Sequence, residues 1–294
     1  MRPGQFFLCW YTSPSKTNPT CGKIEQTSLM RRVKFVTIGF FDSGIGGITV
    51  LHQALRILPK EDYVFYADTA HVPYGEKTKE EVRGYIFDAV DFIAKQGVKA
   101  IVIACNTATS IAIEDLRCKY DFPILGIEPA VKPAVQKWQG KRKKVLVLAT
   151  NLTLQEEKYH KLVKSVDHQD IVDNLALPGL VEFAEKFEFH DEKVLPYLRE
   201  QLSSFDLNEY GTVVLGCTHF PYFTNHLKKL FPEGVDMISG STGTAKNLRR
   251  ILAAQGQLSE GNGDIVYYQS GMKVEDSKLL ANYRELLGML DHLQ

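Results

Sequence analysis

The sequence predicts an α/β fold in which parallel strands alternate with helices. From Val33 onward, short β-branched and aromatic runs alternate with amphipathic helical patterns, which is the signature of βαβ units on a parallel sheet. The layout also occurs twice, because Cys105 follows Asp42 and Cys217 follows Thr150 at nearly the same interval. A chain of 294 residues is long enough for two such domains. We therefore expect two similar α/β domains whose carboxyl-edge crevices face each other across a cleft.

The individual elements follow from local patterns. Apolar runs bounded by turn residues predict strands at VTIGFFD (36–42), YVFYAD (63–68), AIVIAC (100–105), PILGI (123–127), KVLVLAT (144–150), IVDNLAL (171–177) and TVVLGC (212–217). Apolar residues at helical spacing predict helices over 49–58 and 80–96, and a helical segment over 110–120.

Two stretches of the chain bear on the domain organisation. Residues 1–33 show neither helical nor strand periodicity and are expected to form an N-terminal extension. The basic run at 141–144 precedes the first strand of the second half and is typical of a solvated turn. We expect a discontinuous first domain over 34–130 and 236–294, and a second domain over 131–235.

Composition narrows the class of protein. The 35 basic side chains balance the 35 acidic ones, so charge favours neither nucleic acid nor a membrane as a partner. The five cysteines are widely spaced, with no CxxC pair and no zinc-type spacing, so we expect neither a disulfide framework nor a metal site. No apolar run is long enough for a membrane span or a signal peptide. These features predict a reduced, cytoplasmic protein.

Two cysteines stand where a buried strand passes into a helix. Cys105 ends IVIAC and is followed by Asn106 and Thr107, while Cys217 ends VVLGC and is followed by Thr218 and His219. The carboxyl end of a parallel strand faces the ligand crevice, and a helix start helps to stabilise a thiolate. One buried cysteine is usually only a small apolar residue. Two with matching polar neighbours favour a pair of thiols that act on one substrate.

Two further motifs could offer hydrogen-bond donors to an anion. DSGIGG, with Asp42 and Ser43, follows a strand and opens a helix, where backbone amides receive negative charge. It lacks the spacing of a nucleotide-binding loop, and a tight turn capped by Asp42 explains it equally well. Tyr74 and Gly75 end the rigid HVPYG turn and could present amides to a carboxylate, although turn chemistry alone also accounts for this segment.

Together, DSGIGG, ADTAHVPYG, ACNTAT and GCTHFP resemble, in order and spacing, the glutamate racemases of the aspartate/glutamate racemase superfamily. The resemblance extends from Val36 to the C-terminus. It implies two flavodoxin-like three-layer domains related by a pseudo-two-fold axis, with the active site between them. It also implies interconversion of L- and D-glutamate without a cofactor, supply of D-glutamate for bacterial peptidoglycan, and a homodimer.

The resemblance also assigns residues. Cys105 and Cys217 match the acid/base thiols, and Asp42 and His219 match residues that assist them. Glu182, in PGLVEFAE, is matched to an acidic residue near the second thiol. The residues matched to substrate binding are Asp42, Ser43, Tyr74, Gly75, Asn106, Thr107, Thr150, Thr153, Thr218 and His219, with Thr153 a better match than Thr150. Two features depart from the family pattern: the extension before Val33, and Ile238 in the late strand DMISGSTG (236–243), where many relatives have an acidic residue.

Other functions remain open on the residues alone. The protein could be a racemase for another acidic amino acid, chiefly aspartate, whose side chain is one methylene shorter than that of glutamate. A non-catalytic amino-acid-binding protein could share the two-lobed layout, although binding alone does not need two matched thiols. A redox dithiol is disfavoured because the sequence has no CxxC pair.

Overall fold

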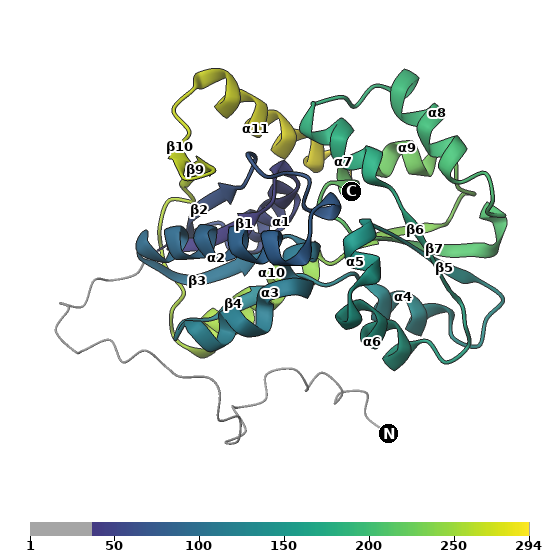
Figure 1. Ribbon diagram of the computed structural model, residues 1–294, viewed down its shortest axis with the longest axis horizontal. Helices are drawn as coiled ribbons and strands as arrows, with labels where there is room; N and C mark the ends of the chain where they lie inside the picture. Colours follow the sequence, from purple (N-terminus) through teal and green to yellow (C-terminus); the bar gives the residue numbers. More distant parts are fainter. Residues whose placement is uncertain (1–36, 294) are drawn as a thin grey trace.

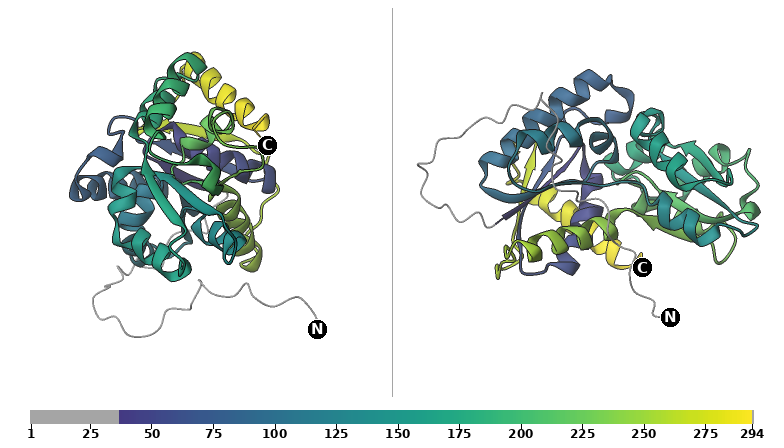
Figure 2. Two further views of the ribbon diagram at one scale, coloured as in Figure 1. Left: turned by 90° about the vertical axis from the view of Figure 1, so that its right-hand side faces the viewer. Right: turned by 90° about the horizontal axis from the view of Figure 1, so that it is seen from below.

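The computed structural model describes residues 37–293, and the N-terminal extension predicted over 1–33 lies outside them (Figure 1). Two bodies, each a β-sheet covered by helices, lie side by side (Figure 2). This arrangement confirms the predicted α/β fold with two domains.

The first sheet has six strands in the order β10-β9-β2-β1-β3-β4. All neighbouring strands are parallel except the β9–β10 pair, which is antiparallel. The strands are β1 (Thr37–Asp42), β2 (Asp62–Ala67), β3 (Val98–Ile103), β4 (Ile124–Gly126), β9 (Ile265–Gln269) and β10 (Met272–Lys273).

The second sheet has four parallel strands in the order β6-β5-β7-β8. They are β5 (Lys144–Ala149), β6 (Val172–Ala176), β7 (Tyr210–Leu215) and β8 (Asp236–Ser239). This order repeats the β2-β1-β3-β4 order of the first sheet, strand for strand. The repeated layout that the sequence predicted is therefore present, with β3 and β7 at equivalent places.

Helices cover both faces of each sheet. In the first domain, α1, α10 and α11 pack together and α2 packs on α3, while in the second α4 packs on α6. The helices are α1 (Ile48–Ile57), α2 (Lys79–Lys95), α3 (Asn106–Lys119), α4 (Val131–Trp138), α5 (Asn151–Gln155), α6 (Glu157–Val166), α7 (Pro178–Glu185), α8 (Asp191–Gln201), α9 (Thr224–Lys228), α10 (Ser241–Ala254) and α11 (Ser277–Asp291). Short 3-10 turns occur at η1 (Ile45–Gly47), η2 (Tyr74–Glu76), η3 (Leu207–Glu209) and η4 (Phe220–Phe223).

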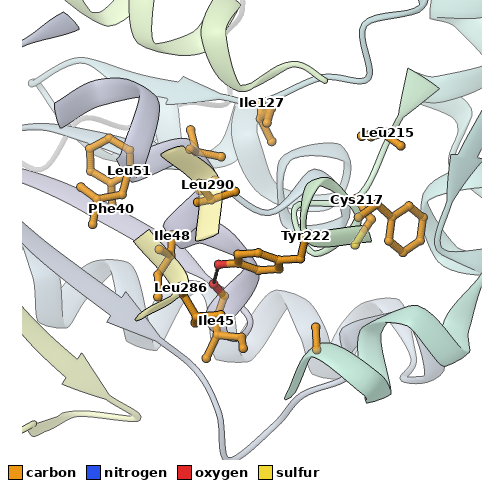
Figure 3. Close-up of a cluster of buried hydrophobic side chains, with 14 of the residues drawn as sticks. Phe40, Ile45, Ile48, Leu51, Ile127, Leu215, Cys217, Tyr222, Leu286 and Leu290 are labelled. Carbon is orange, nitrogen blue, oxygen red and sulfur yellow. Dashed lines mark hydrogen bonds between the residues drawn. The ribbon is translucent and has the colours of Figure 1, made fainter. Parts of the chain in front are cut away.

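Alternation along the strands explains these layers. Phe40 belongs to the core cluster under α1, whereas its neighbour Phe41 belongs to the cluster under α2 and α3, as expected when successive side chains point to opposite faces. The first of these clusters continues into the second domain, where it includes Leu215 and Cys217 (Figure 3). In the same view the hydroxyl of Tyr222 donates to the carbonyl of Ile45 at 3.1 Å. Apolar packing therefore joins the two domains at this cluster.

Three details differ from the sequence predictions. The strand at 236–239 pairs with β7 in the second sheet, although the predicted boundary gave it to the first domain. Strands β9 and β10 were not predicted. Strands β3 and β7 end two residues before Cys105 and Cys217, so each thiol lies in the turn beyond its strand. Within residues 37–293, no helix has the length and apolar character of a membrane span.

Candidate active site

A cavity of about 490 Å³ lies where the carboxyl ends of β1, β3, β5 and β7 meet. This volume includes space that is open to solvent. Most of the residues predicted from the sequence line it: Ser43, Tyr74, Gly75, Cys105, Asn106, Thr107, Thr150, Thr153, Cys217, Thr218 and His219. Two predicted residues, Asp42 and Glu182, do not.

Cys105 occupies the N-cap of α3. Its sulfur accepts a hydrogen bond from the Ala108 amide at 3.4 Å, and its thiol donates to Ser43 Oγ at 3.6 Å. Burial, and next the charge of Asp42, raise the pKa of the Cys105 thiol well above its usual value. The sequence suggested that the helix start would favour a thiolate. Burial has the larger effect, so Cys105 holds its proton.

Cys217 faces a histidine that is itself held by a carboxylate. Its sulfur lies 3.5 Å from His219 Nδ1, and His219 Nε2 lies 2.6 Å from Glu185 Oε1. Burial alone would lower the pKa of His219, but the hydrogen bonds to Cys217 and Glu185 outweigh it and raise this pKa well above the ordinary value. His219 is therefore protonated near neutral pH. With both ring nitrogens protonated, Nε2–H donates to Glu185 and Nδ1–H is directed at the Cys217 sulfur.

Asp42 lies behind the cavity wall and is completely buried. Its carboxylate accepts the Gly47 amide at 2.7 Å and the Thr218 hydroxyl at 3.4 Å. Burial raises the pKa of Asp42 to about 6, against the lowering effect of the charge on His219. Because Thr218 follows Cys217, this carboxylate connects the loop after β1 to the loop that carries the second thiol.

Three threonine hydroxyls meet where the two domains touch. Thr107 Oγ1 lies 3.0 Å from Thr150 Oγ1 and 3.0 Å from Thr153 Oγ1, and the latter two are 3.0 Å apart. Beside them, the buried Asn106 Oδ1 has no hydrogen-bond partner among the described residues. A buried polar atom without a partner is costly. A donor group on a ligand in this cavity would satisfy it.

The η2 turn forms another wall. The Tyr74 hydroxyl donates to Asp68 Oδ2 at 2.6 Å, which holds the ring in place. Gly75 packs so closely on the second domain that a Cβ at this position would lie 3.0 Å from the Cβ of Thr150. The backbone of η2 is thereby fixed beside α5.

The structure places Glu185 against His219, where the sequence analysis had placed Glu182. Glu182 is half exposed, and Lys186 on the same helix donates to it at 3.4 Å. Glu185 Oε1 accepts from both His219 and the Ile45 amide, the latter at 2.8 Å. The residue types in PGLVEFAE did not separate the two glutamates, because only the fold turns the helix face that carries Val181 and Glu185 toward the cavity.

Among residues 37–293, no cluster of histidine, cysteine and acidic side chains has the arrangement of a metal site. The groups that line the cavity include two thiols, one protonated imidazole, hydroxyls, amides and, on η2, the carboxylate of Glu76. Such a set can move protons and can bind anionic groups through neutral donors.

Comparison with known proteins agrees with this chemistry. Residues 48–247 match the family model described as Asp/Glu/Hydantoin racemase. The chain is also 62% identical, over 257 residues, to glutamate racemase 2 of Bacillus subtilis, which covers 87% of this chain and 97% of the relative. The chain belongs to the glutamate racemase family. A glutamate racemase from Halothermothrix orenii is 56% identical over 85% of this chain and 98% of its own length.

Solved structures of glutamate racemases have the same fold. The Escherichia coli enzyme in complex with L-glutamate and an activator superposes with a TM-score of 0.75 and 27% identity, covering 85% of this chain and 95% of that one. The Francisella tularensis enzyme in complex with D-glutamate gives a TM-score of 0.74 and 26% identity, covering 87% and 95%. The family resemblance and the fold class predicted from sequence are confirmed, and the chain is an isomerase of the amino-acid racemase type.

Proposed function

We propose that this protein interconverts L- and D-glutamate by proton transfer between the α-carbon and two thiols, Cys105 and Cys217, without a cofactor. The observation that carries the proposal is that both thiols, one from each domain, are buried and line a single cavity. The names of the relatives and the L- and D-glutamate complexes of two similar structures support the choice of substrate.

Inversion at the α-carbon requires removal of a proton from one face and its return on the other. A single base cannot easily reach both faces, whereas thiols on two walls can do so with little movement of the substrate. Cys217 serves as the thiolate in one direction, because protonated His219 stabilises negative charge on its sulfur. Cys105, which holds its proton, then supplies it to the opposite face. The roles reverse for the other enantiomer.

Neutral donors hold the two carboxylates of the substrate. Among the described residues, no lysine or arginine lines the cavity, so hydroxyls and backbone amides take this role. We assign Ser43, the Tyr74–Gly75 amides, Thr107, Thr153 and Thr218 to carboxylate binding, with Thr150 supporting the other threonines. The unpartnered Asn106 Oδ1 accepts from the ammonium group. This ammonium group brings positive charge close to the thiols and favours their ionised forms.

The proposal includes the cellular setting. Supply of D-glutamate for peptidoglycan, a cytoplasmic location and a homodimer are typical of the family and belong to the same hypothesis.

Solvent deuterium wash-in at the α-carbon tests the chemistry. The wild type should incorporate deuterium from L- and from D-glutamate, and Cys105→Ala and Cys217→Ala should each abolish racemisation while keeping the fold. Cys118→Ala, at an exposed position on α3, is the matched control and should retain full activity. Normal turnover by either active-site variant would refute the two-thiol mechanism, and wild-type binding of glutamate without exchange would favour a binding protein. Aspartate, assayed in parallel, separates the two acidic substrates.

A further inference from the structure

An ion pair joins the two domains beside the cavity. Lys79 Nζ donates to Glu156 Oε2 at 2.7 Å. Lys79 is the first residue of α2 and follows η2, whereas Glu156 lies between α5 and α6. Both η2 and α5 contribute residues to the cavity wall. The pair therefore connects the two walls of the cavity, although neither of its residues lines the cavity.

Both ends of the pair belong to fixed backbone. On the first domain, Thr78 and Glu81 form a capping box that fixes the start of α2. On the second, the Glu156 amide donates to the carbonyl of Thr153, and its own carbonyl accepts the Tyr159 amide at 3.0 Å. A change in the distance between Lys79 and Glu156 would therefore move the segments that carry Gly75 and Thr153.

Burial of Glu156 favours the state in which the ion pair is formed. Glu156 is only 7% exposed, while Lys79 is half exposed. Burying a carboxylate without a partner costs free energy. If the walls separated, Glu156 would lose Lys79 and would stay unpaired until water reached it. The next residue offers a contrast, because Glu157 pairs with Lys161 within α6 and both side chains are exposed. That pair lies within one helix, and the charge of Lys79 is only the smallest of the effects that lower the pKa of Glu157.

We propose that Lys79 and Glu156 are positioning residues that act as an interdomain clasp and hold the walls of the cavity closed on bound substrate. The proposal rests on the racemase function proposed above. Closure keeps the α-carbon between the two thiols and limits access of water, and both effects favour transfer of a poorly acidic proton.

Steady-state racemisation of both enantiomers tests the clasp in Glu156→Gln and in Lys79→Met, with Glu157→Gln as the matched control. Each clasp variant should raise KM and lower kcat/KM roughly tenfold, because the substrate must then close the cleft without the ion pair. The rise in Tm on adding D-glutamate should also shrink in these variants. The exchanged pair Lys79→Glu with Glu156→Lys should recover most of the loss.

Two results would overturn the clasp. One is kinetics of Glu156→Gln and Lys79→Met equal to those of the wild type and Glu157→Gln. The other is a lower Tm without ligand but an unchanged KM and an unchanged D-glutamate-induced shift, which indicates a structural role only. Lys79→Met keeps the test valid if Glu156→Gln does not fold, since Lys79 is at the exposed end. A wild type that exchanges no α-proton would refute the proposed function instead.

Discussion

Glu185 Oε1 accepts two hydrogen bonds, from His219 Nε2 at 2.6 Å and from the Ile45 amide at 2.8 Å. A single carboxylate on α7 thus holds the histidine beside Cys217 and the turn after β1. Replacement by Glu185→Gln removes the charge that helps to raise the pKa of His219. The stabilising effect of protonated His219 is lost as pH rises through its pKa, so the fall of kcat/KM on the alkaline side should move to lower pH.

We expect Glu185→Gln to lower kcat/KM about tenfold or more near pH 8, as measured by circular dichroism over a pH series. Glu182→Gln is the control, since Glu182 pairs with Lys186 at the surface, and its profile should match the wild type. Identical profiles for the two variants would remove Glu185 from the mechanism.

Asp42 should make stability depend on pH. Its pKa is raised from 3.8 to about 6 by burial, so between these values the folded protein retains a proton that the unfolded chain has lost. Stability therefore falls as pH rises through this window and remains lower above it. In Asp42→Asn this dependence is absent, so the free energy of unfolding of the variant relative to wild type should increase by about 2 kcal/mol between pH 4 and pH 7.

Urea unfolding at a series of pH values measures this effect. Ser43→Ala changes the adjacent residue without removing a titrating group, and its curve should run parallel to that of the wild type. A curve for Asp42→Asn that also ran parallel would contradict the effect of burial on Asp42.

Gly46 and Gly243 offer a contrast in available space. A Cβ on Gly46 would lie 2.5 Å from Thr218 Oγ1 and 2.6 Å from His219 Nδ1, whereas a Cβ on Gly243 in α10 meets nothing within 4 Å. Gly46→Ala should lose activity and about 1–3 kcal/mol of stability. Gly243→Ala should keep activity and gain up to about 1 kcal/mol through helix propensity. Racemase assays and thermal unfolding of the two variants measure these effects on activity and stability. Wild-type activity in Gly46→Ala would be inconsistent with the close packing of Gly46 on Thr218 and His219.

Thr153→Val tests the group of threonine hydroxyls. Valine keeps the shape of threonine but removes one of the three hydroxyls that meet at 3.0 Å. We expect KM for glutamate to rise about tenfold, as for a lost hydrogen bond to a charged group, with a smaller effect on kcat. Thr244→Val is the control, because its hydroxyl donates to the Gly240 carbonyl in α10. Equal KM values in the two variants would exclude Thr153 from carboxylate binding.

Local sequence patterns predicted much of this molecule. The apolar runs located the seven strands from β1 to β7, and the polar neighbours of Cys105 and Cys217 identified two segments that line one cavity. These features depend on residues close together in the chain, because the alternation of side chains along a strand and the residue types in a turn are local properties of the sequence.

The remaining features depend on contacts distant in sequence. Strand β9 is a short IVYYQ run in a glycine-rich stretch, and it becomes a strand by pairing with β2. Strand β8 joins the second sheet because its backbone meets β7, which no local pattern determines. Glu182 and Glu185 are equivalent by residue type, and only the orientation of α7 against η1 directs Glu185 toward His219.

The repeated strand order places Cys105 and Cys217 at equivalent positions, yet their neighbours differ. Ser43 and a helix start lie beside Cys105, whereas His219, held by Glu185, lies beside Cys217. Enantiomers have equal free energy in water, so the equilibrium constant for racemisation is one. The Haldane relation then requires equal kcat/KM in the two directions, whatever the local environments. Any asymmetry between the thiols can therefore appear only in matched changes of kcat and KM, so that the enantiomer that turns over faster must also be the one with the higher KM.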